Sequence, residues 1–420
     1  MINITKFGLT RGFHLFSLFI ALQVALTTVN AQQVTLSGKL IDSDDGEPLP
    51  FATIGIEGTS IGVISNTLGD FDFHFESQLA SGKLVIRMLG YQDHVQAISE
   101  LDLNALTTFR MNKMSIQLKE VVIVDSLTGG EILKIALERV TQNYPSEPYT
   151  MDGFYRDLKI VDEKYVSLLE AAFNIYDKDY SVPRNPLKLR ERVGLIEVRK
   201  SLNYEAQYRE YFDQYNQLEE MLLQNNIKYH DFTQEQAFYD NIIRRDIVGM
   251  GDNAFYELSL KGDYDYSLTV FVDAETYGIQ KLIFHHGDMK QSLQEISRSG
   301  KRIEKIMRIE KEIEFTKYRG KLFLKYMKVT TFNNWTYRDS DELLAQTQLQ
   351  QFLVINKVDT QNPEWITTGK KMKKYGLEFQ DLPYNKVFWD NYNLLKDTPL
   401  DKQIVKDLER YGTLNEQFQY

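Results

Sequence analysis

The sequence reads Gly38-Lys39-Leu40-Ile41-Asp42 and, further along, Leu68-Gly69-Asp70-Phe71-Asp72-Phe73. Apolar and polar residues alternate through the whole region 34–114 that contains these stretches, and the alternation places Phe71, Phe73 and Phe75 on one face of a strand. Turn-forming residues such as Asp45-Gly46-Glu47-Pro48 separate the alternating runs at close intervals. This pattern predicts a β-sandwich of about seven strands.

The same region resembles the carboxypeptidase-regulatory-like domain, a transthyretin-like β-sandwich of many Bacteroidota surface and periplasmic proteins. The matching motifs are Gly38-x-x-x-Asp42, Gly46-Glu47-Pro48-Leu49-Pro50-Phe51-Ala52, Gly58-Thr59, Asn66-x-x-Gly69-x-Phe71 and Leu89-Gly90-Tyr91. The resemblance implies a sandwich domain over residues 32–114. It implies no activity, because the domain accompanies very different partners and a fold alone does not determine function.

Residues 1–31 have the pattern of a secretory signal peptide. Lys6 and Arg11 make its start positive, residues 13–26 are apolar, and Val29-Asn30-Ala31 ends in a small residue of the kind that signal peptidase accepts. An N-terminal membrane anchor is the alternative, but the apolar core is short for that role. We expect cleavage after Ala31, which removes two cations and no acid and so changes the formal charge from −10 to −12.

The composition argues against several classes of protein. The chain has 49 Lys and Arg against 59 Asp and Glu and no basic block, which disfavours nucleic acid and anionic membrane surfaces as partners. It has no cysteine, so disulfides, a thiolate nucleophile and the lipobox cysteine of a lipoprotein are excluded. No later run is long and apolar enough to span a bilayer as a helix. We expect an exported protein of the periplasm or outer-membrane periphery that is neither a lipoprotein nor an integral membrane protein.

Residues 115–148 are predicted to form a linker and a helix. Thr128 and Glu131 have the spacing of a capping box, and Asn143-Tyr144-Pro145 ends the helix because proline disfavours helical backbone in the residue before it.

Long alternating strands dominate residues 149–360 and predict a large curved antiparallel sheet, similar to a half-barrel. Within the run 303–315, Ile303, Lys305, Met307, Ile309, Lys311, Ile313 and Phe315 are expected on one face and charged residues on the other. The segment 271–279 is similar to a strand-turn-strand unit of lipoprotein-carrier-like half-barrels. That similarity implies an apolar ligand inside the curved sheet.

A helical insertion is predicted near residues 202–224, where apolar side chains fall on one helical stripe. The stripe contains Tyr204, Tyr208, Tyr211, Tyr215, Leu218 and Leu222. One interpretation is that this helix packs on the sheet and completes the core. The other makes it a lid over an apolar groove, with Tyr208, Tyr211, Tyr215 and Leu218 as ligand-binding residues, since tyrosine combines an apolar body with a polar tip.

Residues 361–420 are predicted to be a helical tail packed on the sheet domain. Thr398 and Pro399 are expected to begin a helix whose apolar face includes Leu408 and Tyr411 and which ends at Gly412. Trp365, Phe388 and Trp389 are expected to anchor the tail. Together with Asp152-Gly153-Phe154-Tyr155-Arg156-Asp157, the tail resembles an uncharacterised second domain found after the regulatory-like domain in other exported Bacteroidota proteins.

No catalytic motif has its required context. A zinc carboxypeptidase needs His-x-x-Glu, which is absent, and Gly58-Thr59-Ser60-Ile61-Gly62 matches the serine-hydrolase pattern but is not followed by a helix. His285 and His286 are adjacent on a predicted strand and therefore point to opposite faces. The acidic loop 42–47 suggests calcium, although its glycine is fifth rather than sixth. Glu170 with Asp177, or Asp263 with Asp265, are candidate acid-base pairs, but nothing in their spacing requires pairing and solvated surface positions are the simpler explanation.

The sequence therefore predicts a mainly β exported protein without a catalytic site, metal or cofactor, whose function is binding or scaffolding in the cell envelope. Its expected partner is an envelope or outer-membrane protein. A carrier of a lipid or other apolar ligand in the sheet domain is the first alternative, and a hydrolase with an unrecognised site is the second.

Overall fold

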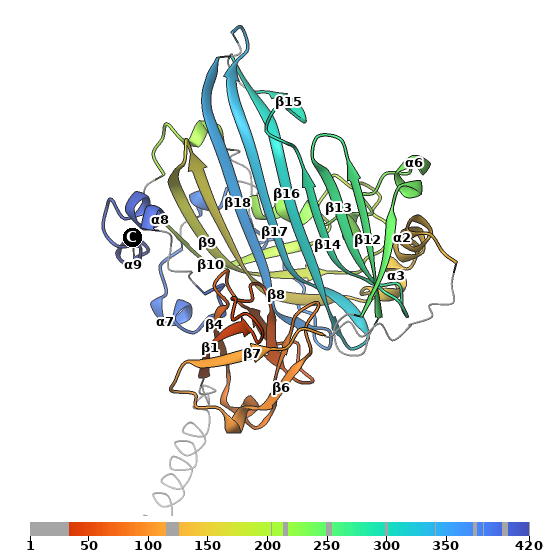
Figure 1. Cartoon of the computed structure of the whole chain (residues 1–420). Helices are drawn as coiled ribbons and strands as arrows, with labels where there is room; N and C mark the ends of the chain where they lie inside the picture. The colour runs from red at the N-terminus through yellow and green to blue at the C-terminus, as the bar shows by residue number, and fades with distance from the viewer. Residues whose placement is uncertain are drawn as a thin grey trace, which may run out of the picture.

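The computed structural model describes residues 33–114, 126–202, 204–212, 217–248, 254–298, 301–340, 342–372, 376–380, 382–396 and 402–419. The predicted signal peptide, most of the predicted linker, Tyr215 and the helix start at Thr398 lie outside these residues. The described chain is mainly β, as predicted, and consists of a small sandwich beside one large sheet (Figure 1).

The sandwich has the seven strands that the alternation predicts. They are β1 (Gln33–Asp42), β2 (Thr53–Ile56), β3 (Gly62–Ile64), β4 (Asp70–Glu76), β5 (Lys83–Arg87), β6 (His94–Ala97) and β7 (Thr107–Met111). One sheet has the order β4-β1-β7 and the other β3-β2-β5-β6. Phe71, Phe73 and Phe75 are buried between the sheets, at 0–2% exposure, because they share one face of β4.

One turn of the sandwich requires glycine. Gly69 has φ +77° just before β4, and a Cβ atom there would lie 2.2 Å from the carbonyl oxygen of Leu40. Leu40 donates its backbone N–H to the Gly69 oxygen at 2.8 Å, so the turn holds β1 and the start of β4 together. Any side chain at this position would be strained and would clash with the backbone.

The large sheet contains eleven antiparallel strands among the described residues. They are β8 (Tyr149–Val161), β9 (Lys164–Asp177), β10 (Arg192–Lys200), β11 (Ile243–Val248), β12 (Ala254–Gly262), β13 (Tyr266–Asp273), β14 (Ile279–His286), β15 (Gln294–Ser297), β16 (Arg302–Tyr318), β17 (Lys321–Tyr337) and β18 (Leu343–Asp359). The order is β10-β9-β8-β18-β17-β16-β14-β13-β12-β11, and β15 pairs with β16 outside this path. The sheet is therefore open, with β10 and β11 at its two edges.

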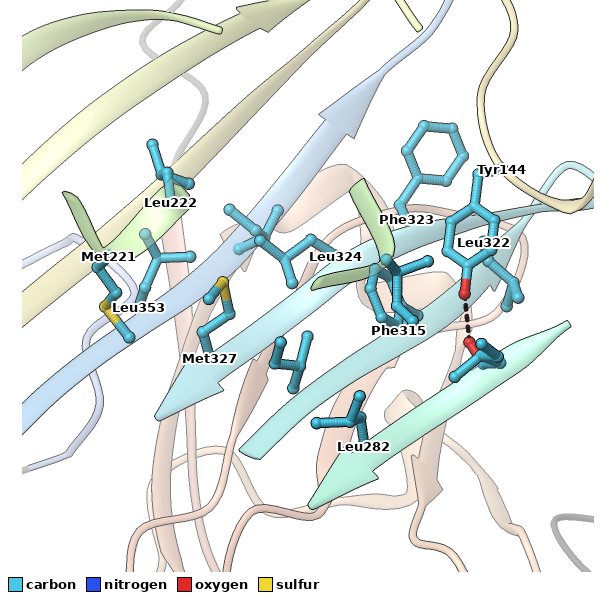
Figure 2. Packing of buried hydrophobic residues seen from close by; sticks show 14 of the residues in the cluster. Tyr144, Met221, Leu222, Leu282, Phe315, Leu322, Phe323, Leu324, Met327 and Leu353 are labelled. Carbon is cyan, nitrogen blue, oxygen red and sulfur yellow. Dashed lines mark hydrogen bonds between the residues drawn. The ribbon is translucent and has the colours of Figure 1, made fainter. Parts of the chain in front are cut away.

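Since β10 and β11 are consecutive in the chain but lie at opposite edges, the segment 201–242 has to cross one face of the sheet. That face, here called the helical face, is covered by α2 (Gly129–Glu138), α3 (Val140–Asn143), α4 (Gln217–Leu223), α5 (Asn226–Tyr229) and α6 (Gln236–Asp240). Figure 2 shows Met221 and Leu222 of α4 packed near Met327 and Leu353 of the sheet. At the other end of this core, Tyr144 donates its hydroxyl to the Ile279 carbonyl at 2.5 Å.

Two local predictions about helices have different outcomes. The capping box is confirmed, because Thr128 Oγ1 accepts from the Glu131 N–H and the Glu131 carboxylate accepts from the Thr128 N–H. The helical insertion predicted near residues 202–224 is present only in part and is not one continuous helix. Only η3 (Arg209–Tyr211) and α4 are helical among its described residues, because the segment must follow the width of the sheet and turn at Phe212 into extended backbone.

The face assignment for residues 303–315 is also partly wrong. The pairing register of β16 with β17 shifts between Ile306 and Arg308, so Met307 is the extra residue of a β-bulge. The bulge reverses which side chains point to each face. Ile309, Lys311, Ile313 and Phe315 do share the helical face with the core of the domain, whereas the residues before Met307 are out of phase with them.

The opposite face of the sheet, here called the sandwich face, packs against the sandwich. Ser60 Oγ donates to the Val358 carbonyl of β18 at 2.6 Å and accepts from the Val358 N–H at 3.1 Å. The Phe51 ring lies 5.8 Å from both the Tyr326 and the Phe352 rings. Backbone and aromatic contacts of this kind hold the two parts in one orientation.

The C-terminal segment completes this interface. It contains η4 (Leu377–Phe379), α7 (Lys386–Trp389), α8 (Lys402–Leu408) and α9 (Leu414–Gln417). Asn393 bridges to the sandwich by accepting from the His74 N–H at 2.8 Å and donating to the His74 carbonyl at 3.0 Å. Trp389 is buried on the sandwich face, whereas Trp365 is 49% exposed. Tyr411 does not line the apolar face as predicted, because α8 ends at Leu408 and Tyr411 is 59% exposed.

Candidate functional site

A pocket of about 390 Å³ opens on the helical face between the sheet and the α5–α6 segment. Its size lies within the range of small-molecule sites, and its walls combine aromatic and aliphatic side chains with a few polar groups. The lining residues are Asn226, Asp231, Phe232, Thr233, Glu235, Phe238, Tyr266, Leu268, Leu282, Phe284 and Lys311.

Lys311 is the cation of this pocket and comes from the middle of β16. Its Nζ donates to the Gln224 carbonyl at 3.1 Å and to Asn226 Oδ1 at 2.9 Å, and it lies 5.8 Å from the Phe284 ring centre. Burial lowers the pKa of Lys311 to about 8, against a weaker opposing effect of Asp231. An ammonium group has three N–H donors, and two are engaged within the described structure. The third is available to an acceptor group of a ligand.

The aromatic wall comes from both sides of the pocket. Tyr266 and Phe284 lie on neighbouring strands with an edge-to-face ring contact at 5.5 Å. Phe232 and Phe238 belong to the covering segment and are half-buried. Sheet and covering segment therefore contribute apolar surface to the same space. A period-two pattern in β13 and β14 indicates which strand residues face inward, but no sequence pattern indicates which part of the insertion covers them.

The predicted ligand-binding residues do not form one site. Tyr208 and Tyr211 are half-buried and pack with Tyr204, Phe212 and Trp335 in a separate aromatic cluster. The Tyr211 and Trp335 ring centres are 5.4 Å apart. Leu218 is completely buried in the main core on the helical face, and Tyr215 lies outside the described residues. None of the three described residues lines the Lys311 pocket.

The other sequence candidates are engaged in structural contacts. The Asp42 and Asp45 carboxylates both pair with Lys113 Nζ, at 2.7 and 3.1 Å. The ammonium group of Lys113 therefore lies where the acidic loop suggests a calcium ion. His285 donates from Nε2 to Asp265 Oδ2 at 2.9 Å, while His286 packs against Tyr266.

Neither carboxylate of the first acid-base candidate faces the other as a catalytic pair. Glu170 Oε1 accepts from Arg156 Nε at 2.6 Å, and its other oxygen accepts from Arg199 Nε at 2.5 Å. These two guanidinium groups hold the pKa of Glu170 below its usual value despite complete burial. Asp177 instead pairs with Lys228 and accepts from the Tyr149 hydroxyl.

Comparison with known protein families identifies the N-terminal sandwich. Residues 36–123 match the family model of the CarboxypepD_reg-like domain. The sandwich is a CarboxypepD_reg-like domain. This confirms the resemblance noted in the sequence, and the match covers the N-terminal part of the chain alone. No curated protein matches the sequence at a significant level.

Solved structures with some likeness to this chain include three bacterial proteins. A LolA superfamily protein from Nitrosomonas europaea is 12% identical, with a TM-score of 0.19, over 56% of this chain and 95% of that chain. A DUF1329 family protein from Desulfovibrio piger is 11% identical, with a TM-score of 0.21, over 54% and 92%. MucB in its complex with MucA from Pseudomonas aeruginosa is 9% identical, with a TM-score of 0.19, over 56% and 99%. At these scores the likeness carries no argument about function.

The CarboxypepD_reg-like domain does not contribute to the Lys311 pocket. All lining residues belong to the large sheet or to the segment that covers it, whereas the CarboxypepD_reg-like domain packs on the sandwich face. Among the described residues, no helix has the length and apolar character needed to cross a bilayer.

Proposed function

We propose that this chain is a non-catalytic binding protein of the cell envelope, and that the Lys311 pocket holds a small apolar molecule carrying an anionic group. The observation that carries the proposal is the placement of one half-buried lysine among six aromatic or aliphatic side chains of the pocket, whose two acids, Asp231 and Glu235, are exposed. A ligand chain would occupy the apolar space. Its anionic group would accept from Lys311 Nζ.

Export through the N-terminal signal sequence is part of the same proposal. The absence of a catalytic role is supported by the engagement of the strongest hydrolase candidate. The Ser60 hydroxyl is bound to the backbone of Val358 on both its donor and its acceptor side. A serine nucleophile instead needs a neighbouring base that takes its proton.

The pocket predicts how binding depends on the ligand's head group. Dodecanoate and dodecanol have the same apolar chain, but the carboxylate alone can form a charge-assisted hydrogen bond with Lys311. We expect dodecanoate to bind about tenfold or more tightly than dodecanol at pH 7. The pKa of Lys311 is lowered to about 8. The preference for dodecanoate should therefore decrease as the pH rises through that value, because the ammonium loses its proton.

Two substitutions and a matched control test the site by isothermal titration calorimetry. Lys311→Met should remove the preference for the carboxylate while retaining dodecanol binding. Thr233→Trp, at an exposed position on the pocket rim, should reduce binding of both molecules by filling the opening. Lys317→Met changes an exposed lysine of the same strand and should have no effect. Equal binding of the two molecules by the wild-type protein would refute the assignment.

The natural occupant is accessible by native mass spectrometry of protein purified gently from its own envelope fraction. A mass excess that is lost on denaturation and extracts as lipid would support the binding proposal. A second polypeptide that arrives with the protein, with no small molecule, would instead favour the scaffold role.

A further inference from the structure

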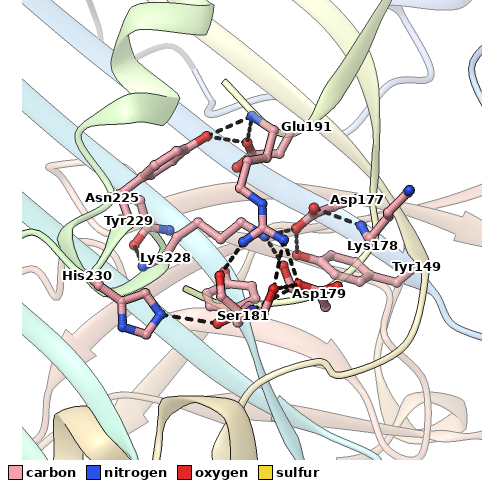
Figure 3. A network of polar contacts seen from close by, with 12 residues as sticks. Tyr149, Asp177, Lys178, Asp179, Ser181, Glu191, Asn225, Lys228, Tyr229 and His230 are labelled. Carbon is pink, nitrogen blue, oxygen red and sulfur yellow. Dashed lines mark hydrogen bonds and ion pairs between the residues drawn. The ribbon is translucent and has the colours of Figure 1, made fainter. Parts of the chain in front are cut away.

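The connection between β9 and β10, residues 178–191, is fixed at its base by a buried polar network (Figure 3). Lys228, at 1% exposure, pairs with the Asp177 carboxylate at the end of β9 and also donates to the Asp179 carbonyl. Its Nζ lies 4.4 Å from the centre of the Tyr180 ring. Lys228 thus fastens the first residues of the connection to α5.

The far end of the connection is held by a second set of contacts. Tyr229 of α5 donates its hydroxyl to Glu191 Oε2 at 2.5 Å and accepts from the Arg190 N–H at 3.2 Å. Arg190 reaches back to Asp179 at 2.5 Å and also donates to the Ser181 carbonyl. Both ends of the loop are therefore tied to each other and to the same helix.

Between these fixed ends, the tip Val182-Pro183-Arg184-Asn185-Pro186-Leu187-Lys188 extends into solvent. Leu187 is 86% exposed and Val182 is 68% exposed, while Arg184 and Lys188 are exposed as well. Folding gains nothing from leaving two aliphatic side chains this far in water. Pro183 and Pro186 lie between them, and because proline fixes φ, they limit the conformations that the tip can adopt.

A cleft of about 610 Å³ lies beside the tip and is lined by several basic residues, of which Arg190 is paired with Asp179. Five of its lining residues are basic and none is acidic, although the whole chain carries a formal charge of −10. The basic residues are Lys178, Arg184, Lys188, Arg190 and Arg192. Trp365, 49% exposed, forms one wall and stacks with the Arg192 guanidinium, 4.4 Å from its ring centre.

We propose that the 178–191 loop is a docking element for an anionic lipid surface, in which Val182 and Leu187 enter the boundary of the acyl chains and the basic residues contact lipid head groups. Exposed aliphatic side chains beside cations and an interfacial tryptophan are the combination that peripheral membrane attachment uses. A soluble anion would be bound by the basic residues and would not require exposed aliphatic side chains. The two exposed aliphatic residues therefore favour a lipid surface over a soluble ligand.

The acidic balance of the whole chain does not oppose this docking. At physiological ionic strength the interaction between exposed charges is screened beyond about 8 Å. Asp179 lies within this distance and is paired with Arg190, so the head groups would respond mainly to Lys178, Arg184, Lys188 and Arg192 rather than to acids farther away on the surface. The inference is independent of the Lys311 pocket, because no lining residue is shared by the two sites.

The test is co-sedimentation of the purified protein with vesicles of phosphatidylcholine alone and of phosphatidylcholine mixed with phosphatidylglycerol. We expect binding to the anionic vesicles and its loss as salt is added. Arg184→Gln and Lys188→Gln should each weaken the binding about fivefold. Val182→Asp with Leu187→Asp should abolish it, because aspartate would have to enter the acyl-chain boundary.

Matched controls distinguish the loop from the rest of the surface. Leu106→Asp replaces an aliphatic residue of the sandwich that is also well exposed, at 61%, and Lys290→Gln replaces an exposed lysine whose side chain is 85% accessible. Neither should change vesicle binding. Circular dichroism should show unchanged folding in all variants, because every substitution is at an exposed position.

Three outcomes would overturn the proposal. The first is failure of the wild-type protein to bind phosphatidylglycerol vesicles, and the second is equal binding by the loop variants. The third is vesicle association that survives the aspartate substitutions but is displaced by soluble polyphosphate, which would assign the cleft to a soluble anion.

Discussion

Replacing Lys325 by methionine is expected to stabilise the protein at neutral pH. Lys325 is the extra residue of a bulge in β17, since Glu314 pairs with Tyr326 and Phe315 with Leu324. It is 3% exposed, and its Nζ lies 3.3 Å from the position that a Cβ atom of Gly62 in the sandwich would take. Its ammonium is thus confined between the two parts of the molecule.

The magnitude follows from the protonation equilibrium. Burial lowers the pKa of Lys325 to about 8, from the usual 10.5, and the nearby Glu314 opposes that shift only in part. A difference of this size means that keeping the buried ammonium protonated at pH 7 disfavours folding by roughly 3 kcal/mol. Lys325 also donates to the Ile355 carbonyl at 3.3 Å, and losing this bond costs about 1 kcal/mol. The net expectation for Lys325→Met at pH 7 is about 2 kcal/mol of stabilisation.

The pH dependence gives the sharper test. Unfolded lysine keeps its proton up to about pH 10.5, whereas folded Lys325 releases it near pH 8. Between these values the unfolded state binds more protons, so the stability of the wild-type protein rises with pH relative to the variant. The advantage of Lys325→Met should therefore decrease above pH 8 and disappear near pH 9.5, within about one pH unit.

Urea unfolding followed by tryptophan fluorescence at pH 7, 8, 9 and 9.5 measures both effects. Lys261→Met removes an exposed lysine from another strand of the same sheet and should change stability little at any of these pH values. A destabilised Lys325→Met variant, or a stability difference that does not vary with pH, would refute the reasoning.

Three further substitutions probe the contacts that hold the structure together. Ser60→Ala removes both hydrogen bonds to Val358 and should lower the free energy of unfolding by about 1–3 kcal/mol; an unchanged urea midpoint would show that the contact contributes nothing. Lys228→Met leaves Asp177 buried without its cation and should lower the free energy of unfolding by about 3–5 kcal/mol, part of which a second substitution, Asp177→Asn, should restore. Glu170→Gln should destabilise at pH 7, and because the folded pKa of Glu170 is lowered, the wild-type advantage should be complete above about pH 4.5 and fall as the pH decreases below it. Thermal melts of both proteins between pH 3 and 7 would reveal this convergence.

Local patterns were sufficient for the elements whose side chains alternate or cap. The three phenylalanines of β4 occupy the sandwich core because alternation forces them to one face. The capping box at Thr128 is also a local interaction, complete within four residues. Such features do not depend on distant parts of the chain, so the sequence alone predicts them.

The candidate sites illustrate the opposite case. The sequence identifies Lys311 as a cation within an apolar strand face. It does not show that Lys311 lies in a pocket, because Phe232 and Phe238 of that pocket belong to the segment that crosses the sheet. The tyrosines at 208 and 211 have a helical spacing, yet the chain bends at Phe212 and places them in a different cluster from Leu218. Periodicity describes one element and cannot show which elements meet.

The sequence by itself determined the mainly β class, the CarboxypepD_reg-like sandwich, the capped helix and the absence of cysteine chemistry, because each of these depends on neighbouring residues or on composition. The tertiary structure alone decided that β8 pairs with β18, which places β10 and β11 at opposite edges and sends the intervening segment across the helical face. The Lys311 pocket and the fixed base of the 178–191 loop both arise from that crossing. Pairing between strands so distant in sequence depends on the burial of the complete sheet, which no local pattern encodes.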